Sequence, residues 1–139
     1  MTSLFDELQE LVLRDARTIY SETTIDHFMN PRNHGPMDQA DGFAKVCGPC
    51  GDTISIWLKV EKDIITDIAF TTDGCGTSIA SGSMVTSLAR GKSLDEARKI
   101  GQQDVLAALS GLPKENEHCA LLASNTLKDA IKDFLASGK

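Results

Sequence analysis

The residue types that could do chemistry in this chain of 139 residues gather in three short stretches, residues 47–52, 73–76 and 118–119. The first reads Cys-Gly-Pro-Cys-Gly-Asp, the second Asp-Gly-Cys-Gly and the third His-Cys. Thiolates, carboxylates and imidazoles bind zinc and iron–sulfur clusters, and thiolates also attack sulfur. The three stretches therefore predict a metal site, a redox pair or a reactive nucleophile, and the surrounding elements must decide which.

Three of the four cysteines, Cys50, Cys75 and Cys119, lie where a predicted loop meets a regular element. Cys75 and Cys119 come at the start of predicted helices, where the helix dipole and free N–H groups favour a thiolate. A zinc finger or ribbon pairs its cysteines closely in sequence, whereas these three are far apart. If the fold brings them together, Asp52 and His118 come with them, and this donor set suits zinc or an iron–sulfur cluster.

Each candidate also has a purely structural interpretation. A free cysteine is often a small buried apolar residue, and a single aspartate or histidine is more often a turn or loop residue. Cys47 forms a Cys-x-x-Cys pair with Cys50, but a thioredoxin-like redox motif is followed by a helix, and this pair is followed by a strand pattern. Glycine-flanked cysteines at the ends of elements favour ligands over packing. We interpret Cys47 as a neighbour of the site, and His27 and His34 as structural or surface residues.

Alternating apolar and polar residues predict three strands, over residues 42–47, 53–60 and 64–72. In the third strand, Ile64, Thr66, Ile68 and Phe70 are expected on one face, and Ile65, Asp67 and Ala69 on the other. The short turn between the last two strands predicts an antiparallel hairpin.

Helices are predicted on both sides of these strands. An amphipathic helix and a short helix precede them, over residues 1–20 and 24–29, and four helices follow, starting near residues 77, 94, 102 and 118. The expected helix caps are Ser21 or Thr23, Thr77 or Ser78, and Ser93. Separate groups of strands and helices predict a single α+β domain over residues 1–139, with a three-stranded antiparallel sheet, helices packed on one face and an N-terminal helical extension over residues 1–19.

The composition excludes several classes of function. The net charge is −6 and the pI is about 4.9, so the chain is not expected to bind nucleic acid. No apolar run approaches the roughly 20 residues that a membrane span needs, and charged residues interrupt the N-terminal segment, which argues against a signal peptide. We therefore expect a cytoplasmic protein whose thiols stay reduced and bind metal or react.

A set of short motifs runs from about Tyr20 to the C-terminus. In order they are Tyr20-Ser21, Asp26-His27-Phe28, Asn30-Pro31-Arg32-Asn33, Cys50-Gly51-Asp52, Gly74-Cys75-Gly76, Ile79-Ala80-Ser81, the run Gly-Lys-Ser-Leu-Asp-Glu-Ala at residues 91–97, and His118-Cys119. In their order and spacing the chain resembles the iron–sulfur cluster scaffold proteins of the IscU and NifU N-terminal type. The resemblance implies a scaffold rather than an enzyme, with the α+β sandwich of that family.

The resemblance implies that a 2Fe–2S cluster is assembled from iron and from persulfide sulfur supplied by a pyridoxal-phosphate cysteine desulfurase, and is then passed to acceptor apoproteins. Cys50, Cys75 and Cys119 correspond to cluster ligands, and Cys119 to the usual persulfide acceptor. Asp52 and His118 correspond to alternative fourth ligands, or aid assembly and release. Family members also bind zinc in this site. A ferredoxin, a frataxin-like protein and a second copy of the chain are further partners to expect.

The chain departs from the family pattern in three places. The bacterial housekeeping branch carries Leu-Pro-Pro-Val-Lys before its His-Cys, where a dedicated Hsp70 chaperone binds, whereas residues 112–117 here read Leu-Pro-Lys-Glu-Asn-Glu. This disfavours chaperone-driven release and favours a NifU-like or archaeal-like variant. The interval between Cys75 and Cys119 has no room for the insertion of the zinc-dependent sulfur-acceptor branch, and Cys47 is not a usual family cysteine.

Overall fold

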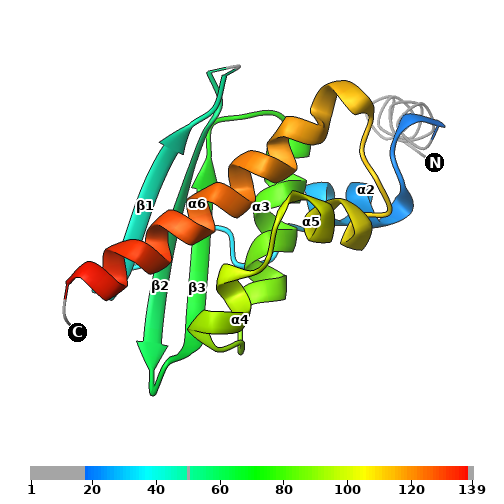
Figure 1. Ribbon diagram of the computed structural model, residues 1–139. Helices are drawn as coiled ribbons and strands as arrows, with labels where there is room; N and C mark the ends of the chain where they lie inside the picture. The colour runs from blue at the N-terminus through cyan, green and yellow to red at the C-terminus, as the bar shows by residue number, and fades with distance from the viewer. Residues whose placement is uncertain (1–17, 50, 138–139) are drawn as a thin grey trace, which may run out of the picture.

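The computed structural model describes residues 18–49 and 51–137, and in it helices cover one face of a three-stranded sheet (Figure 1). The predicted helical extension over residues 1–19 lies outside the described residues, apart from Thr18 and Ile19, which are helical. Cys50 also lies outside them. In the part of the chain that the structure describes, we find no helix long and apolar enough to cross a membrane.

The order of elements confirms the α+β prediction. From the N-terminal side the elements are α2 (Glu22–Met29), β1 (Gly42–Cys47), β2 (Thr53–Glu61), β3 (Ile64–Thr72), α3 (Gly76–Ala89), α4 (Leu94–Arg98), α5 (Gln102–Ala108), the 3₁₀ helix η1 (Lys114–Asn116) and α6 (Glu117–Ala136). Two predicted caps are confirmed: the Ser21 hydroxyl accepts from the Thr24 N–H at the start of α2, and Ser93 and Glu96 form a capping box on α4.

The sheet is antiparallel, with strand order β1-β2-β3. Lys62 and Asp63 make the turn between β2 and β3, and both have positive φ, 52° and 63°. A two-residue turn with both central residues in the left-handed region matches the right-handed twist of the strands that it joins. The β2–β3 hairpin therefore places the start of β2 beside the end of β3.

The alternation in β3 differs from the prediction near this turn. The pairing of β2 with β3 shifts between Lys59 and Val60, at a β-bulge. Beyond the bulge Ile65 is fully buried, whereas Ile64 is 37% exposed. The prediction that Ile64 shares the buried face of the strand is wrong, because a bulge interrupts the period of two on which it rested.

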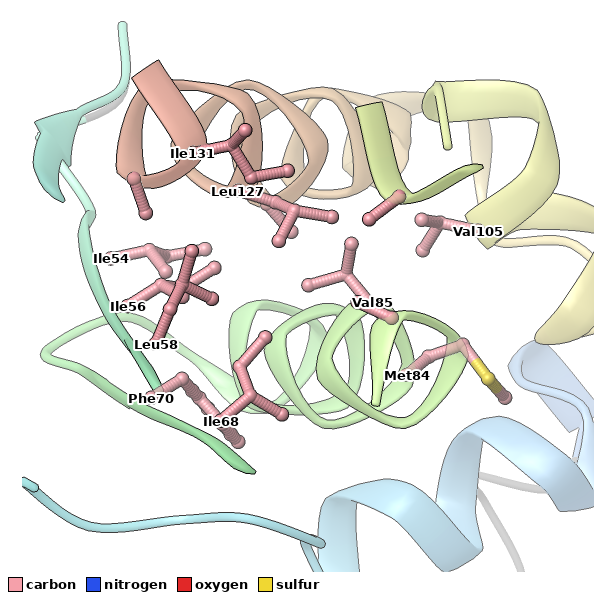
Figure 2. Close-up of a cluster of buried hydrophobic side chains, with 14 of the residues drawn as sticks. Ile54, Ile56, Leu58, Ile68, Phe70, Met84, Val85, Val105, Leu127 and Ile131 are labelled. Atoms are coloured by element: carbon pink, nitrogen blue, oxygen red, sulfur yellow. The ribbon is translucent and has the colours of Figure 1, made fainter. Parts of the chain in front are cut away.

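The apolar core lies between the sheet and the helices α3 and α6. Figure 2 shows side chains from the strands and from both helices pointing toward one another. The labelled members are Ile54, Ile56, Leu58, Ile68, Phe70, Met84, Val85, Val105, Leu127 and Ile131. Burying a side chain of this size contributes about 1.5–3 kcal/mol. This layer therefore holds α3 and α6 firmly on the sheet and fixes where their N-termini lie.

Candidate metal centre

The N-termini of α3 and α6 lie at the same end of the molecule as the start of β2 and the end of β3 (Figure 1). Hydrogen bonds of Thr72 fasten the strand ends: its hydroxyl donates to the Thr53 carbonyl at 2.7 Å and accepts from the Gly74 N–H at 3.0 Å. The chain before β2 turns at Gly51, which has a φ of +85°, a conformation that favours glycine. These local features bring Asp52 beside the segment that leads into α3.

Cys75 is the N-cap residue of α3 and is exposed. The helix therefore begins before Thr77 and Ser78, and the prediction that one of these two residues caps it is wrong. Both hydroxyls lie in the first turn of the helix instead, where they are free to bond to the site. The Thr77 hydroxyl lies 3.0 Å from the Cys75 sulfur.

Cys119 and His118 lie in the first turn of α6, which begins at Glu117. The Cys119 side chain is buried, with 1% of the residue exposed, whereas His118 is only partly buried. The Cys119 Sγ lies 3.7 Å from His118 Nε2. The last helix therefore presents a thiol and an imidazole at the same point.

Residues from three separate parts of the chain converge at this end of the sheet. One potential ligand atom from each of Asp52, His118 and Cys119 lies within 4.8 Å of the other two. The Cys75 sulfur joins this group through the Thr77 hydroxyl, which also lies 3.4 Å from the Cys119 sulfur. Two thiols, a carboxylate and an imidazole are a donor set that suits zinc or iron–sulfur chemistry.

The two hydroxyls that connect these groups were missed as site residues by the sequence analysis. The Ser78 hydroxyl donates to Asp52 Oδ2 at 2.9 Å and lies 3.6 Å from the Cys119 sulfur. A signal was present, because two hydroxyl residues follow Cys75 directly within the first helical turn. The sequence analysis interpreted these hydroxyls as helix caps, and this interpretation left out their role in the site.

The two described thiols of the site have opposite pKa shifts. Partial burial raises the pKa of Cys75, but hydrogen bonds from the Thr77 hydroxyl and from the Ser78 and Thr77 backbone N–H groups outweigh it, so the pKa lies below its usual value. Burial raises the pKa of Cys119, and the nearby Thr77 and Ser78 hydroxyls do not offset it. The expectation that a helix start favours the thiolate is thus confirmed for Cys75 and wrong for Cys119.

Close packing at Gly74 holds the site together. A Cβ atom at this position would lie 2.5 Å from the Ser78 Oγ and 2.9 Å from the Asp52 Cγ. These separations are shorter than atoms in van der Waals contact allow, so only glycine fits between the two side chains.

The remaining candidates are Cys47, His27 and His34. Cys47 ends β1 as an exposed thiol. His27 is buried between α2 and α3, where its Nδ1 lies 2.7 Å from the Ser83 hydroxyl. His34 packs against the Phe70 ring, with 5.2 Å between ring centroids. The structural interpretation of both histidines is confirmed.

Similarity to known proteins covers nearly all of the described chain. The model of the NifU-like N terminal domain family matches residues 19–139. An iron–sulfur cluster assembly scaffold protein, IscU 1, of Archaeoglobus fulgidus is 47% identical over 117 residues, which are 84% of this chain and 76% of the relative. The scaffold protein IscU of Escherichia coli K12 is 46% identical over 120 residues, 83% of this chain and 93% of the relative.

The fold agrees with these sequence matches. The crystal structure of the N-terminal part of a nitrogen-fixing NifU-like protein from Brucella abortus superimposes with a TM-score of 0.69. It covers 85% of this chain and 95% of the solved one, at 22% identity, a likeness that concerns the fold alone. The family model and the relatives above 40% identity decide the classification: this chain belongs to the family of NifU-like N-terminal domains.

Proposed function

We propose that this chain is a scaffold on which 2Fe–2S clusters are assembled from iron and from persulfide sulfur delivered by a cysteine desulfurase, before transfer to acceptor apoproteins. Relatives at 46–47% identity carry the name of an iron–sulfur cluster assembly scaffold. The structural observation that carries the proposal is the convergence of Asp52, His118 and Cys119 within 4.8 Å, with Cys75 one hydroxyl away.

Cys50, Cys75 and Cys119 are the proposed cluster ligands, with Asp52 or His118 as the fourth. Thiolates are the usual protein ligands of iron–sulfur clusters, and a carboxylate is a harder and weaker ligand for such a site. A weak fourth ligand suits a protein that must release what it binds. The same donors also suit a tetrahedral zinc ion, which can occupy the site in place of a cluster.

Cys119 is the proposed persulfide acceptor. Its thiolate attacks the outer sulfur of the desulfurase persulfide, the S–S bond of that persulfide breaks, and the desulfurase cysteine leaves as a thiolate. Reducing the transferred sulfur to sulfide takes two electrons, and a ferredoxin is the proposed donor. Because Cys119 is only 1% exposed, the groups that cover its sulfur must move before the desulfurase persulfide can reach it.

The other proposed partners are a frataxin-like protein and a second copy of this chain. A dedicated Hsp70 chaperone is disfavoured as a partner, because residues 112–117 lack the Leu-Pro-Pro-Val-Lys motif. We place the protein in the cytoplasm, where thiols stay reduced and remain able to bind metal.

Anaerobic reconstitution tests the proposal. The purified protein is incubated with ferrous iron, cysteine and a cysteine desulfurase, and the visible spectrum, iron content and sulfide content are recorded. We expect the charge-transfer bands of a 2Fe–2S centre, and their loss in Cys50→Ser, Cys75→Ser and Cys119→Ser variants. The matched control is Cys47→Ser, which should retain the bands because Cys47 is an exposed thiol outside the proposed ligand set.

Two results would count against the scaffold. Tight zinc binding without any cluster would favour a zinc-bound sulfur acceptor. Loss of activity in Cys47→Ser but not in Cys75→Ser would favour a dithiol pair of Cys47 and Cys50. The persulfide assignment is tested separately by mass spectrometry of the desulfurase-treated protein, in which the added sulfur should lie on the peptide that contains Cys119.

A further inference from the structure

The Ser78 hydroxyl donates a hydrogen bond to the Asp52 carboxylate, and Ser78 is not one of the proposed ligands. We propose that Ser78 is a positioning residue, which binds one oxygen of the Asp52 carboxylate so that Asp52 meets a metal through its other oxygen only. This inference rests on the proposed function, because it concerns how the same site holds and releases its metal or cluster.

The contact joins a loop to a rigid element. Asp52 lies between β1 and β2, directly after Gly51 with its positive φ, whereas Ser78 lies in α3 and is fully buried. The Ser78 Oγ to Asp52 Oδ2 distance is 2.9 Å across 26 residues of sequence. A carboxylate on a loop has several accessible orientations, and a hydrogen bond from a packed helix selects one of them.

The chemistry of the groups decides the direction of this hydrogen bond. A serine hydroxyl has one proton to donate, and an ionised carboxylate only accepts. The Cys119 sulfur also lies near the Ser78 oxygen, but at 3.6 Å it is farther away and a weaker acceptor. The Ser78 proton is therefore directed to Asp52, and the contact is of the stronger, charge-assisted kind.

The packing around Gly74 supports the same role independently. Both the Ser78 and the Asp52 side chains lie so close to Gly74 that a Cβ there would overlap them, at 2.5 Å from the Ser78 Oγ and 2.9 Å from the Asp52 Cγ. The carboxylate is thus confined on one side by the backbone and on another by the hydroxyl. Asp52 is held for one approach to a metal and has little freedom to bind through both oxygens.

This arrangement predicts what happens when the hydroxyl is removed. In Ser78→Ala the carboxylate is no longer held, so the ordered ligand atom is lost while the cysteine thiols and the imidazole remain. Partners of metal ligands typically change metal affinity by about 10–100-fold when they are removed. We expect zinc affinity to fall about tenfold, and a bound cluster to persist longer, because its weak carboxylate ligand is less well placed.

Zinc and cobalt binding provide the first test. Zinc affinity is measured by competition with a chromophoric chelator, and the d–d bands of bound Co²⁺ report the geometry at the metal. The expected result for Ser78→Ala is about a tenfold weaker zinc complex and altered Co²⁺ bands. The matched control is Ser87→Ala on the same helix, whose hydroxyl donates to the Ser83 carbonyl, and which should leave both readouts unchanged.

A double-mutant cycle with Asp52→Ala shows whether Ser78 acts through the carboxylate. If it does, Ser78→Ala has no further effect on zinc affinity in the Asp52→Ala background. If Ser78→Ala lowered zinc affinity equally in the wild-type and Asp52→Ala backgrounds, or did not lower it in the wild type, the inference would be overturned. An unchanged zinc affinity in Asp52→Ala alone would also overturn it, whereas the scaffold proposal itself is decided by the cysteine variants.

Cluster lifetime separates positioning from a general loss of structure. The decay of the reconstituted cluster is followed by its visible absorption in the wild type, Asp52→Ala and Ser78→Ala. We expect Asp52→Ala to prolong the lifetime and Ser78→Ala to prolong it by a smaller factor. A shorter lifetime in Ser78→Ala would show that the residue only supports the fold, and would contradict the proposal.

Discussion

Cys75 and Cys119 each stand at the start of a helix, yet the structure gives them opposite character. Cys75 is an exposed N-cap with a lowered pKa, whereas Cys119 lies two residues into α6, is 1% exposed and has a raised pKa. The Thr77 hydroxyl lies within hydrogen-bonding distance of both sulfurs, at 3.0 and 3.4 Å. A helix N-terminus alone therefore does not decide whether a thiol ionises; the balance of burial and donors does.

The difference suggests a division of work at the site. A thiolate is both the metal ligand and the nucleophile, so the lowered pKa makes Cys75 the readier of the two thiols to bind metal. The raised pKa of Cys119 disfavours its ionisation, which exposure to water or a nearby metal ion would favour. The more protected thiol is also the proposed persulfide acceptor, and a premature sulfur transfer is thereby disfavoured.

The largest expected effect tests the contrast directly. In the metal-free protein at neutral pH, iodoacetamide should alkylate Cys75 about a hundredfold faster than Cys119, because exposure and ionisation both favour Cys75. Peptide mass spectrometry over a time course gives the two rates. Zinc should protect both thiols, and equal rates without metal would remove the basis of the comparison.

Gly74→Ala should disturb the packing that covers Cys119. The added Cβ would overlap the Ser78 and Asp52 side chains, and overpacking of this kind costs about 1–3 kcal/mol. We expect the free energy of unfolding by urea to fall by that amount and Cys119 to be alkylated faster. Gly101→Ala is the control, since a Cβ there meets nothing closer than 4.0 Å and the backbone has an ordinary φ of −115°.

Thr77→Val should reduce the difference in alkylation rate between Cys75 and Cys119, and we expect a smaller effect than for the preceding variant. Valine has the same shape without the hydroxyl that lowers the pKa of Cys75, so less Cys75 is ionised at pH 7 and its alkylation should slow by about threefold to tenfold. The rate measured against pH should show the whole Cys75 profile moved to higher pH. Thr126→Val, a buried hydroxyl on α6 that bonds to the Leu122 carbonyl, should leave that profile unchanged.

The smallest expected effect is a pH dependence of stability that comes from His27, whose Nδ1 lies 2.7 Å from the Ser83 hydroxyl of α3. Burial, with a smaller contribution from Arg32, lowers the pKa of His27, and Asp26 opposes this only in part. The unfolded chain then binds a proton more readily than the folded one, so stability from neutral His27 is complete above about pH 6.5 and is lost as the pH falls below it.

Urea unfolding at several pH values measures this dependence. His27→Gln should remove the part of the pH dependence that lies below about pH 6.5, whereas Thr77→Val should leave it in place. An unchanged pH dependence in His27→Gln would show that His27 does not stay neutral in the folded protein. The two variants thus distinguish the effect of His27, which contacts Ser83 of α3, from the effect of Thr77 at the start of that helix.

The sequence identified the fold where local patterns are strong. Period-two alternation predicted the three strands, and the expected Ser93 cap predicted the start of α4. It placed Ile64 on the wrong face because a bulge depends on how two strands pair, and pairing is not a local property. The extension over residues 1–19 and the position of Cys50 stay predictions.

For the site, the amino-acid types and their place at the ends of elements were sufficient to nominate Asp52, Cys75, His118 and Cys119. Residue type sets the chemistry that a side chain can do, and glycine-flanked boundaries can be read from the sequence itself. Only the tertiary structure decided which groups meet, that Thr77 and Ser78 connect them, and which thiol is buried. Distance, burial and hydrogen bonding arise between segments far apart in the chain, and these quantities set the pKa of a thiol.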